Sequence, residues 1–109
     1  MGSSEVKNTD HIDLAGIKIK ENSWIAKLAA KKLKTENVAI VFGQTIHLHN
    51  VSAAYFLKDE KWLKHETCHI RQYKENGFFT FIIKYVWESI RHGYHNNKFE
   101  AEARLAEEL

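Results

Sequence analysis

The 109-residue sequence contains no proline, a single cysteine, and no low-complexity tract or internal repeat. One cysteine, Cys68, excludes an intrachain disulfide and suits a reducing compartment. The segment Met1–Glu5 has neither the basic stretch nor the apolar stretch that begins a secretory signal, so we expect a cytoplasmic protein. The most apolar run, Phe78–Trp87, is interrupted by Lys84 and is too short to span a bilayer.

The chain also has little net charge. Sixteen Lys and Arg against 14 Asp and Glu leave a formal charge of +2, and the lysines are dispersed. Without a basic stripe, nucleic acid is not an expected partner. By contrast, hydrophobic residues make up 44% of the chain and include three Trp, which indicates a real core. This length fits one compact domain, which we place at residues 16–109 after a flexible leader at residues 1–15.

The first half of the domain shows strand and turn signals around one helix. Residues 16–20 alternate between apolar and polar side chains, which predicts a short strand. Asn22 or Ser23 can cap the helix that follows, and its apolar side carries Trp24, Ile25, Leu28, Ala29 and Leu33. Two β-rich runs at 38–42 and 45–49, separated by Gly43-Gln44, predict a β-hairpin.

The second half is predicted to be helical. The patterns place helices at residues 52–57, 60–75, 78–92 and 98–108. Asp59 can cap the second of these helices, and Gly77 lies where a glycine commonly ends one. The helix at 78–92 is apolar on nearly all sides, which is typical of a buried helix. This order predicts an α+β domain in which a small antiparallel sheet packs on a helical half.

The predicted helix at 60–75 contains the motif His65-Glu66-Thr67-Cys68-His69, an HExxH pattern. Residues four apart lie on one helix face, so the imidazoles of His65 and His69 can bind one Zn²⁺ ion. Glu66 is rotated by about 100° from His65. In known sites of this pattern, that rotation leaves the carboxylate beside the metal, where it accepts a proton from water. A five-residue motif can also arise by chance.

Catalytic zinc usually has three protein ligands, so a third donor is needed. Glu100 and Glu102 open the last predicted helix, which can fold back across the motif. Phe99 and Ala103 indicate the buried side of that helix, and Glu100 lies on it, whereas Glu102 points further toward solvent. We therefore favour Glu100. The alternative is a surface helix in which Glu100 pairs with Arg104, four residues later.

These residues also carry a family resemblance. The stretch Trp62–Tyr73, which reads WLKHETCHIRQY, and the stretch Asn97–Arg104, which reads NKFEAEAR, resemble the minimal HExxH-plus-Glu metallopeptidases, the gluzincin group. Within it, the chain is most similar to short bacterial zincin-like domains that have H-E-x-x-H-x-x-Q and a Gly-centred hairpin. The resemblance covers about residues 36–106. It implies a zincin-like fold with one zinc site, and its E-x-x-A element places the third ligand at Glu100. Cys68 stands where the family often has a hydrophobic residue, and this departure touches no ligand.

Several other residues are candidates for supporting roles. The strand Thr45–His49 is expected to be an edge strand that pairs with an extended peptide or a protein partner. His47 and His49 face the same side of it and offer a second metal site, although surface histidines are the favoured interpretation. Tyr94 and His95 precede the Glu100 helix and are candidate donors to a developing oxyanion.

Three further features have a structural interpretation beside a functional one. Gln72 lies one turn beyond His69, where it can hydrogen-bond to that ligand or be an ordinary polar residue. Cys68 points about 100° away from His69, which favours core packing over metal ligation or redox sensing. The aromatic run in Phe78–Trp87 is most simply core, and any exposed part of it would mark a protein-partner or membrane-surface contact.

The sequence therefore favours a zinc metallopeptidase that hydrolyses a peptide bond, with Glu66 as general base and His65, His69 and Glu100 as metal ligands. The second hypothesis is a catalytically inactive, zinc-stabilised module that binds a protein partner. Its support is the small size of the domain, which leaves little chain for a specificity cleft. The third is a metal-free domain in which the motif arose by chance.

Overall fold

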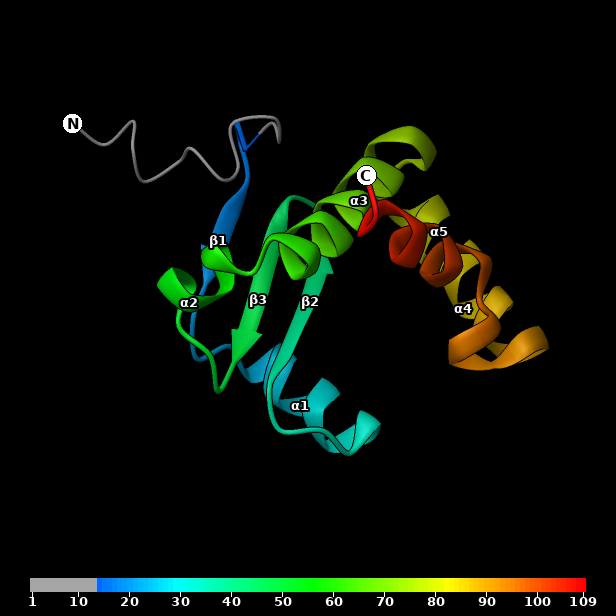
Figure 1. The fold of residues 1–109 in the computed structure, drawn as a ribbon. Coiled ribbons are helices and arrows are strands. Elements are labelled where there is room, and N and C mark those ends of the chain that lie inside the picture. The colour runs from blue at the N-terminus through cyan, green and yellow to red at the C-terminus, as the bar shows by residue number, and fades with distance from the viewer. Residues whose placement is uncertain (1–13) are drawn as a thin grey trace.

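The computed structural model describes residues 14–109, and within them the chain is an α+β fold with three strands and five helices (Figure 1). The predicted leader lies almost entirely outside the described residues. The elements follow one another as β1 (Lys18–Lys20), α1 (Trp24–Leu33), β2 (Val38–Phe42), β3 (Thr45–His49), α2 (Ala53–Lys58), α3 (Glu60–Asn76), α4 (Phe78–Asn96) and α5 (Lys98–Ala106). The expected elements are all present, and most of their ends lie within a few residues of the predicted positions.

The sheet is mixed, with the strand order β1-β3-β2. The predicted hairpin is confirmed, since β2 and β3 are antiparallel and Phe42 pairs with Thr45 across the turn Gly43-Gln44. The expectation of a purely antiparallel sheet is wrong, because β1 pairs with β3 in parallel. The expectation that Thr45–His49 is an edge strand is also wrong, because β1 occupies the side of β3 that the hairpin leaves open. The edge strand of the hairpin is β2.

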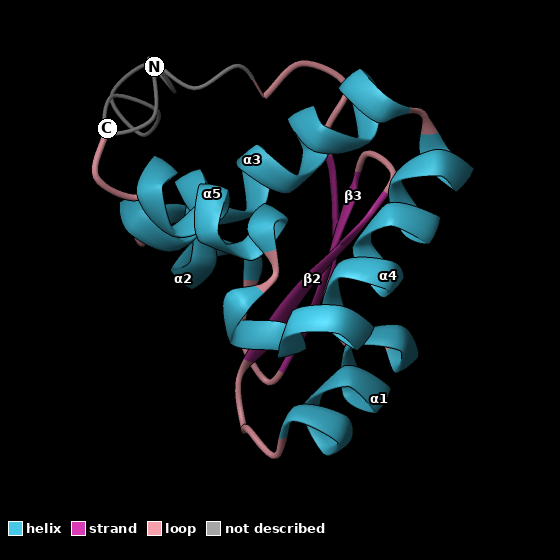
Figure 2. Ribbon diagram, turned by 90° about the vertical axis from the view of Figure 1, so that its right-hand side faces the viewer, coloured by secondary structure: helices cyan, strands magenta, loops and turns pink. Residues whose placement is uncertain are grey.

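Helices cover both faces of the sheet (Figures 1 and 2). Side chains alternate between the two faces of a strand. From β2, Val41 packs into the main core with Phe56 of α2 and Leu63 of α3. On the opposite face, Val38 packs with Ala26 and Ala30 of α1 in a second, smaller cluster. The sheet is therefore a layer between α1 on one side and α2 and α3 on the other.

Side-chain caps and glycines set the helix ends near the candidate site. Asp59 accepts from the backbone N–H of Trp62 at the start of α3, and Gly77, with a φ of 86°, ends that helix. Asn97 caps α5 by accepting from the N–H of Phe99 at 2.8 Å. Gly93 has a φ of 82° and interrupts α4 shortly before that helix ends. The chain thereby reverses into α5, which lies beside α3 in both views.

The expectation that the helix at 78–92 is buried is wrong. Phe81 is its one buried residue, while Phe79, Ile83 and Ile90 are each about 70% exposed. The reason is that α4 meets α3 and α5 along one side only, so an apolar sequence on all sides leaves an exposed apolar stripe. Among residues 14–109, no helix has the length and apolar character required to cross a membrane.

Candidate metal centre

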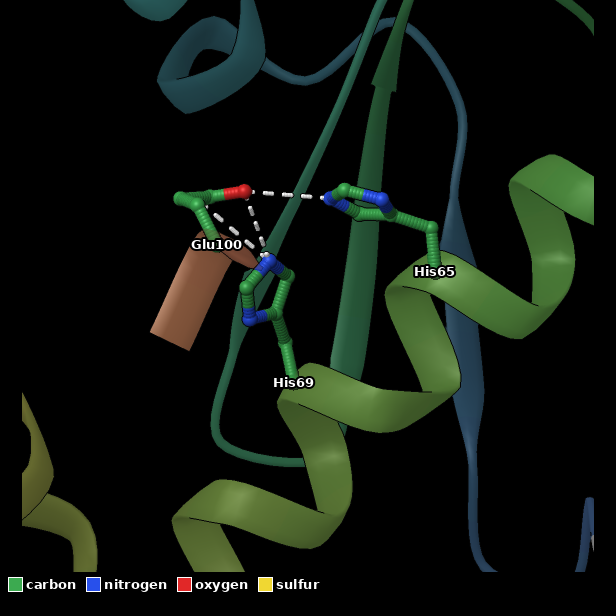
Figure 3. A group of neighbouring side chains, drawn as sticks. All are labelled: His65, His69 and Glu100. Carbon is green, nitrogen blue, oxygen red and sulfur yellow. Dashed lines mark hydrogen bonds and ion pairs between the residues drawn. The ribbon is translucent and has the colours of Figure 1, made fainter. Parts of the chain in front are cut away.

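Helices α3 and α5 bring His65, His69 and Glu100 together (Figure 3). The two histidines lie one turn apart on α3, with ring centroids separated by 5.1 Å. Glu100 lies in the first turn of α5. Its Oε1 is 3.1 Å from Nε2 of His65 and 3.3 Å from Nε2 of His69. One potential ligand atom from each residue lies within 4.8 Å of the others. We call these three residues the donor cluster.

The other ring nitrogen of each histidine, Nδ1, hydrogen-bonds to a side chain outside the donor cluster. Nδ1 of His65 lies 2.7 Å from Oε2 of Glu107, and Nδ1 of His69 lies 2.8 Å from Oε1 of Gln72. Both partners are oxygen acceptors, so each Nδ1 donates its hydrogen outward. Each Nε2 therefore faces Glu100, where it donates while the ring is protonated and offers a lone pair to the centre of the cluster once that proton is lost. Metal-binding histidines are commonly oriented in this way.

Gln72 is itself fixed by α5. Its amide nitrogen donates to the carbonyl of Phe99 at 3.1 Å and to Oε1 of Glu102 at 2.7 Å. Glu102 also accepts from Arg71 at 2.7 Å. The structure therefore places Glu100 beside the histidines, whereas Glu102 accepts hydrogen bonds from Gln72 and Arg71.

Two residues that touch the donor cluster were not predicted to do so. Tyr85 packs against the main core, as the aromatic run predicts, and its hydroxyl also donates to Oε2 of Glu100. Glu107 is one of the acidic residues after the motif, among which Glu100 is the predicted ligand. Glu107 directly follows α5, seven residues after Glu100 and hence on the same side. That spacing is a signal that sequence reasoning can use. Lys64 keeps this end of the chain near α3 by donating to the carbonyl oxygen of Leu109.

The carboxylate of Glu100 is stabilised in its charged form. Burial raises its pKa, but hydrogen bonds from His65, His69 and Tyr85 outweigh burial and hold the pKa well below the usual range. Burial lowers the pKa of His65, but Glu100, Glu66 and Glu107 together raise it to about 9. The cluster thus concentrates negative charge around its imidazoles, which favours a cation at its centre.

Glu66 has a different environment from Glu100. Its side chain is 6% exposed, and burial raises its pKa to about 7, despite the opposing effect of His69 and His65. It lies in the same groove as the donor cluster and does not belong to it. A carboxyl group whose pKa lies near neutrality can take up and release a proton under ordinary conditions.

The donor cluster opens into a groove of about 240 Å³ that runs between α1, β2 and α4. Tyr94 also lines this groove. Burial and the charges of Glu100 and Glu66 raise the pKa of its hydroxyl, so the hydroxyl remains a donor. His95 is exposed and does not line the groove, and its carbonyl accepts from Arg104 at 2.7 Å. Of the two predicted oxyanion donors, the structure brings only Tyr94 to the site.

The remaining candidates, two histidines and the cysteine, are buried or half-buried in the fold. His47 is 9% exposed, and its Nδ1 lies 2.8 Å from the hydroxyl of Ser23, so the interpretation as a surface histidine is wrong for this residue. His47 is central in the sheet and therefore covered. His49 is half-buried at the end of the same strand. Cys68 is buried, as core packing predicts, and burial raises the pKa of its thiol to about 11.

Comparison with known proteins provides no family for this chain. No protein-family model matches the sequence, and no curated protein and no solved structure shows significant similarity to it. Any function must therefore come from the chemistry of the site.

Proposed function

We propose that this protein is a zinc-dependent peptidase of the HExxH-plus-Glu type, with a zincin-like arrangement of its metal helix. The observation that carries the proposal is the donor cluster. Two imidazole nitrogens and one carboxylate converge within 4.8 Å, which is the ligand set that catalytic Zn²⁺ prefers. Gln72 and Glu107 hold the outer nitrogens, so His65 and His69 need only lose the Nε2 proton, without moving their rings, to present lone pairs to a cation.

The remaining groups fit peptide hydrolysis. When bound, zinc supplies Lewis acidity that polarises a carbonyl group and lowers the pKa of nearby water. Glu66 accepts a proton as water oxygen attacks the carbonyl carbon, and it returns a proton to the amine nitrogen when the C–N bond breaks. Its pKa of about 7 suits both steps. Tyr94, at the groove wall, donates a hydrogen bond to the developing oxyanion.

The edge strand that presents substrate in this proposal is β2. It lines the groove along its whole length, whereas β3 lies in the middle of the sheet. An extended peptide that pairs with β2 would run past the donor cluster and Glu66. The sequence predicted that Thr45–His49 pairs with an extended peptide. In this proposal, Val38–Phe42 has that role instead.

The proposal is tested by metal content and by one conservative substitution. Protein purified without chelator should contain one zinc per chain by elemental analysis. Glu66→Gln should retain zinc but hydrolyse a mixed fluorogenic peptide library ~10²–10⁴-fold more slowly, since that is the range of general-base catalysis. Glu75→Gln, at an exposed position on the same helix, is the matched control. Absence of zinc contradicts the metal site, and unchanged cleavage by Glu66→Gln contradicts the catalytic role.

A non-catalytic, zinc-stabilised binding module is the second candidate, and the exposed apolar stripe of α4 favours it. Such a module should bind zinc and gain thermal stability from it without any cleavage in the wild type. A metal-free domain should show the same melting temperature with zinc and with EDTA, because a ligand that binds only the native state raises stability.

A further inference from the structure

The groove beside the donor cluster is apolar on two opposing walls. On one side, α1 contributes Ile25, Ala29 and Leu33, which are spaced four residues apart along one helix face. On the other side, α4 contributes Ile82 and Val86. Both walls continue outward as exposed apolar side chains, including Leu28 on α1 and Ile83 on α4. The polar groups of the groove gather at the donor cluster.

The floor of the groove is a strand edge with backbone groups directed outward. Phe42 and Thr45 flank a two-residue turn, so they form a hydrogen-bonded pair, and every second residue of β2 does the same. Ala39 and Val41 therefore direct their N–H and C=O groups away from β3. The carbonyl of Val41 accepts from the hydroxyl of Tyr73 at 3.2 Å. Ala39 presents both of its groups to a strand that pairs with this edge.

A strand paired with β2 would extend the sheet, so its side chains would alternate between the two faces of the sheet. One face meets the α1 wall, because Val38 of β2 packs on that helix. The other face meets α3 and α4, because Val41 packs with Leu63 and Phe81. The donor cluster lies on the α3 side. Away from it both walls are apolar, so consecutive residues of the paired strand meet apolar surroundings there. An amphipathic strand with alternating polar residues would place all of its polar side chains against one of the apolar walls.

The rim of the groove is basic on the α1 side. Helix α1 carries Lys27, Lys31 and Lys32 and no acidic residue, and Lys34 follows at its C-cap. Lys32 lies three residues after Ala29 and hence on the same side of the helix. Acidic residues beside the apolar run of a bound segment would complement this rim, and basic ones would oppose it.

We propose that the groove selects extended polypeptide segments with about five consecutive apolar residues, the length of β2, flanked by acidic residues. This inference rests on the proposed function and names its substrate class. The geometry supports it through three features that share one groove, namely the unpaired edge at Ala39, the paired apolar walls and the basic rim.

Five fluorescent peptides test the proposal by anisotropy. The first has five alternating leucines and valines between aspartate flanks, a length set by β2. In the second, every other apolar residue is replaced by serine. The third has lysine flanks. The fourth is the first peptide N-methylated at its central residue, and the fifth is the first peptide N-methylated at the neighbouring residue. Titrations are made with zinc and with EDTA.

We expect the first peptide to bind best and the serine peptide to bind ~10-fold or more weakly, since each buried apolar side chain contributes this order of affinity. Lysine flanks should weaken binding severalfold at low salt and less at high salt. Only one of the two N-methylated peptides should lose binding, because only alternate residues pair with the edge. Equal binding of the apolar and serine peptides, or indifference to both N-methyl positions, would overturn the proposal.

Substitutions in the protein place the binding in the groove. Leu33→Glu and Val86→Glu alter the two walls at half-exposed positions, so the fold should be retained. Leu105→Glu, at a 71% exposed position on α5 outside the groove, is the matched control. Loss of binding in the control but not in the wall variants contradicts the assignment. Peptide binding in EDTA without zinc uptake would refute only the metal site, whereas zinc uptake without peptide selectivity would refute only the substrate class.

Discussion

The donor cluster and the groove beside it are built in opposite ways. In the cluster, each ring nitrogen of His65 and His69 has one defined oxygen partner, and Glu100 is 4% exposed. In the groove, the walls are apolar and partly exposed, and they are formed by helices that barely touch one another. The first region is specified by a few short-range polar contacts. The second is specified by how α1 and β2, which follow one another in the sequence, are placed against the distant helix α4.

This difference teaches which parts of such a site tolerate change. A buried polar network loses much when one partner is removed, because the remaining groups stay buried without compensation. An exposed apolar wall loses only the contacts that its ligand would make. We therefore expect substitutions in the cluster to affect metal affinity strongly, and substitutions in the wall to affect ligand choice alone.

The largest expected effect is that of Glu100→Ala. Removal of a ligand should weaken zinc binding by more than ~100-fold, exceeding the ~10–100-fold loss typical of a residue that only supports a ligand. Competition with a chromogenic chelator measures the affinity. Glu102→Ala is the control, since Glu102 contacts Gln72 and not the histidines. Equal losses of zinc affinity in the two variants would contradict the assignment of Glu100, and not Glu102, as a ligand.

Glu107→Gln should have the next largest effect, a ~10–100-fold loss of zinc affinity. The amide is a weaker acceptor for Nδ1 of His65 than the carboxylate, which lies 2.7 Å away. The affinity is best compared well above pH 9, where His65 is mostly deprotonated and proton competition is small. Glu108→Gln, next along the chain and half of an exposed ion pair with Lys61, should match the wild type. An equal loss there would indicate a general charge effect.

The change in zinc affinity that His65 causes over one unit of pH should be smaller than the loss caused by either of these substitutions. His65 has a pKa of about 9 in the metal-free protein, so below that pH a proton must leave before zinc binds. Deprotonation of His65 alone should therefore raise the affinity by up to ~10-fold between pH 7 and pH 8, with a plateau above about pH 9. Burial lowers the pKa of His69, but its hydrogen bond with Glu100 raises it above the usual value, so deprotonation of His69 adds to the rise. Chelator competition across this range gives the profile. A flat profile from pH 7 to 9 would contradict ligation by His65.

The smallest expected effect is that of Ile83→Ser on the exposed stripe of α4. Its side chain is 68% exposed, so the free energy of unfolding should change by less than ~0.5 kcal/mol, and zinc affinity should not change. Phe81→Ala, on the buried side of the same helix, should cost about 3–5 kcal/mol. Urea denaturation compares the two. A large cost for Ile83→Ser would mean that the stripe is covered, and the contrast between cluster and wall would weaken.

Local patterns predicted the elements and the motif because these depend on nearby residues. Asp59, Gly77 and the four-residue spacing of His65 and His69 are short-range signals, and the structure reproduces what they predict. The choice of Glu100 over Glu102 also followed from a local facing argument. The structure agrees with that argument, since Glu100 is buried and Glu102 is exposed.

The features that the sequence did not predict depend on which elements become neighbours. Nothing in residues 16–20 indicates that β1 pairs with β3, and this pairing alone covers the outer side of β3 and leaves β2 as the edge strand of the hairpin. The exposure of α4 follows from how few elements cover it, which its apolar composition cannot reveal. Tyr85 reaches Glu100 for the same reason, because the turn at Gly93 folds α5 back along α4.

The separation of the donors along the chain has a consequence for folding. His69 and Glu100 are 31 residues apart, and they meet only when α5 docks on α3. A cation held by both would therefore act as a cross-link that closes this long loop and lowers the entropy of partly unfolded states. Local opening of α5 would have to release it. Hydrogen exchange at the amides of α5 should thus be slower with zinc than without it, and the difference would measure the effect of this cross-link.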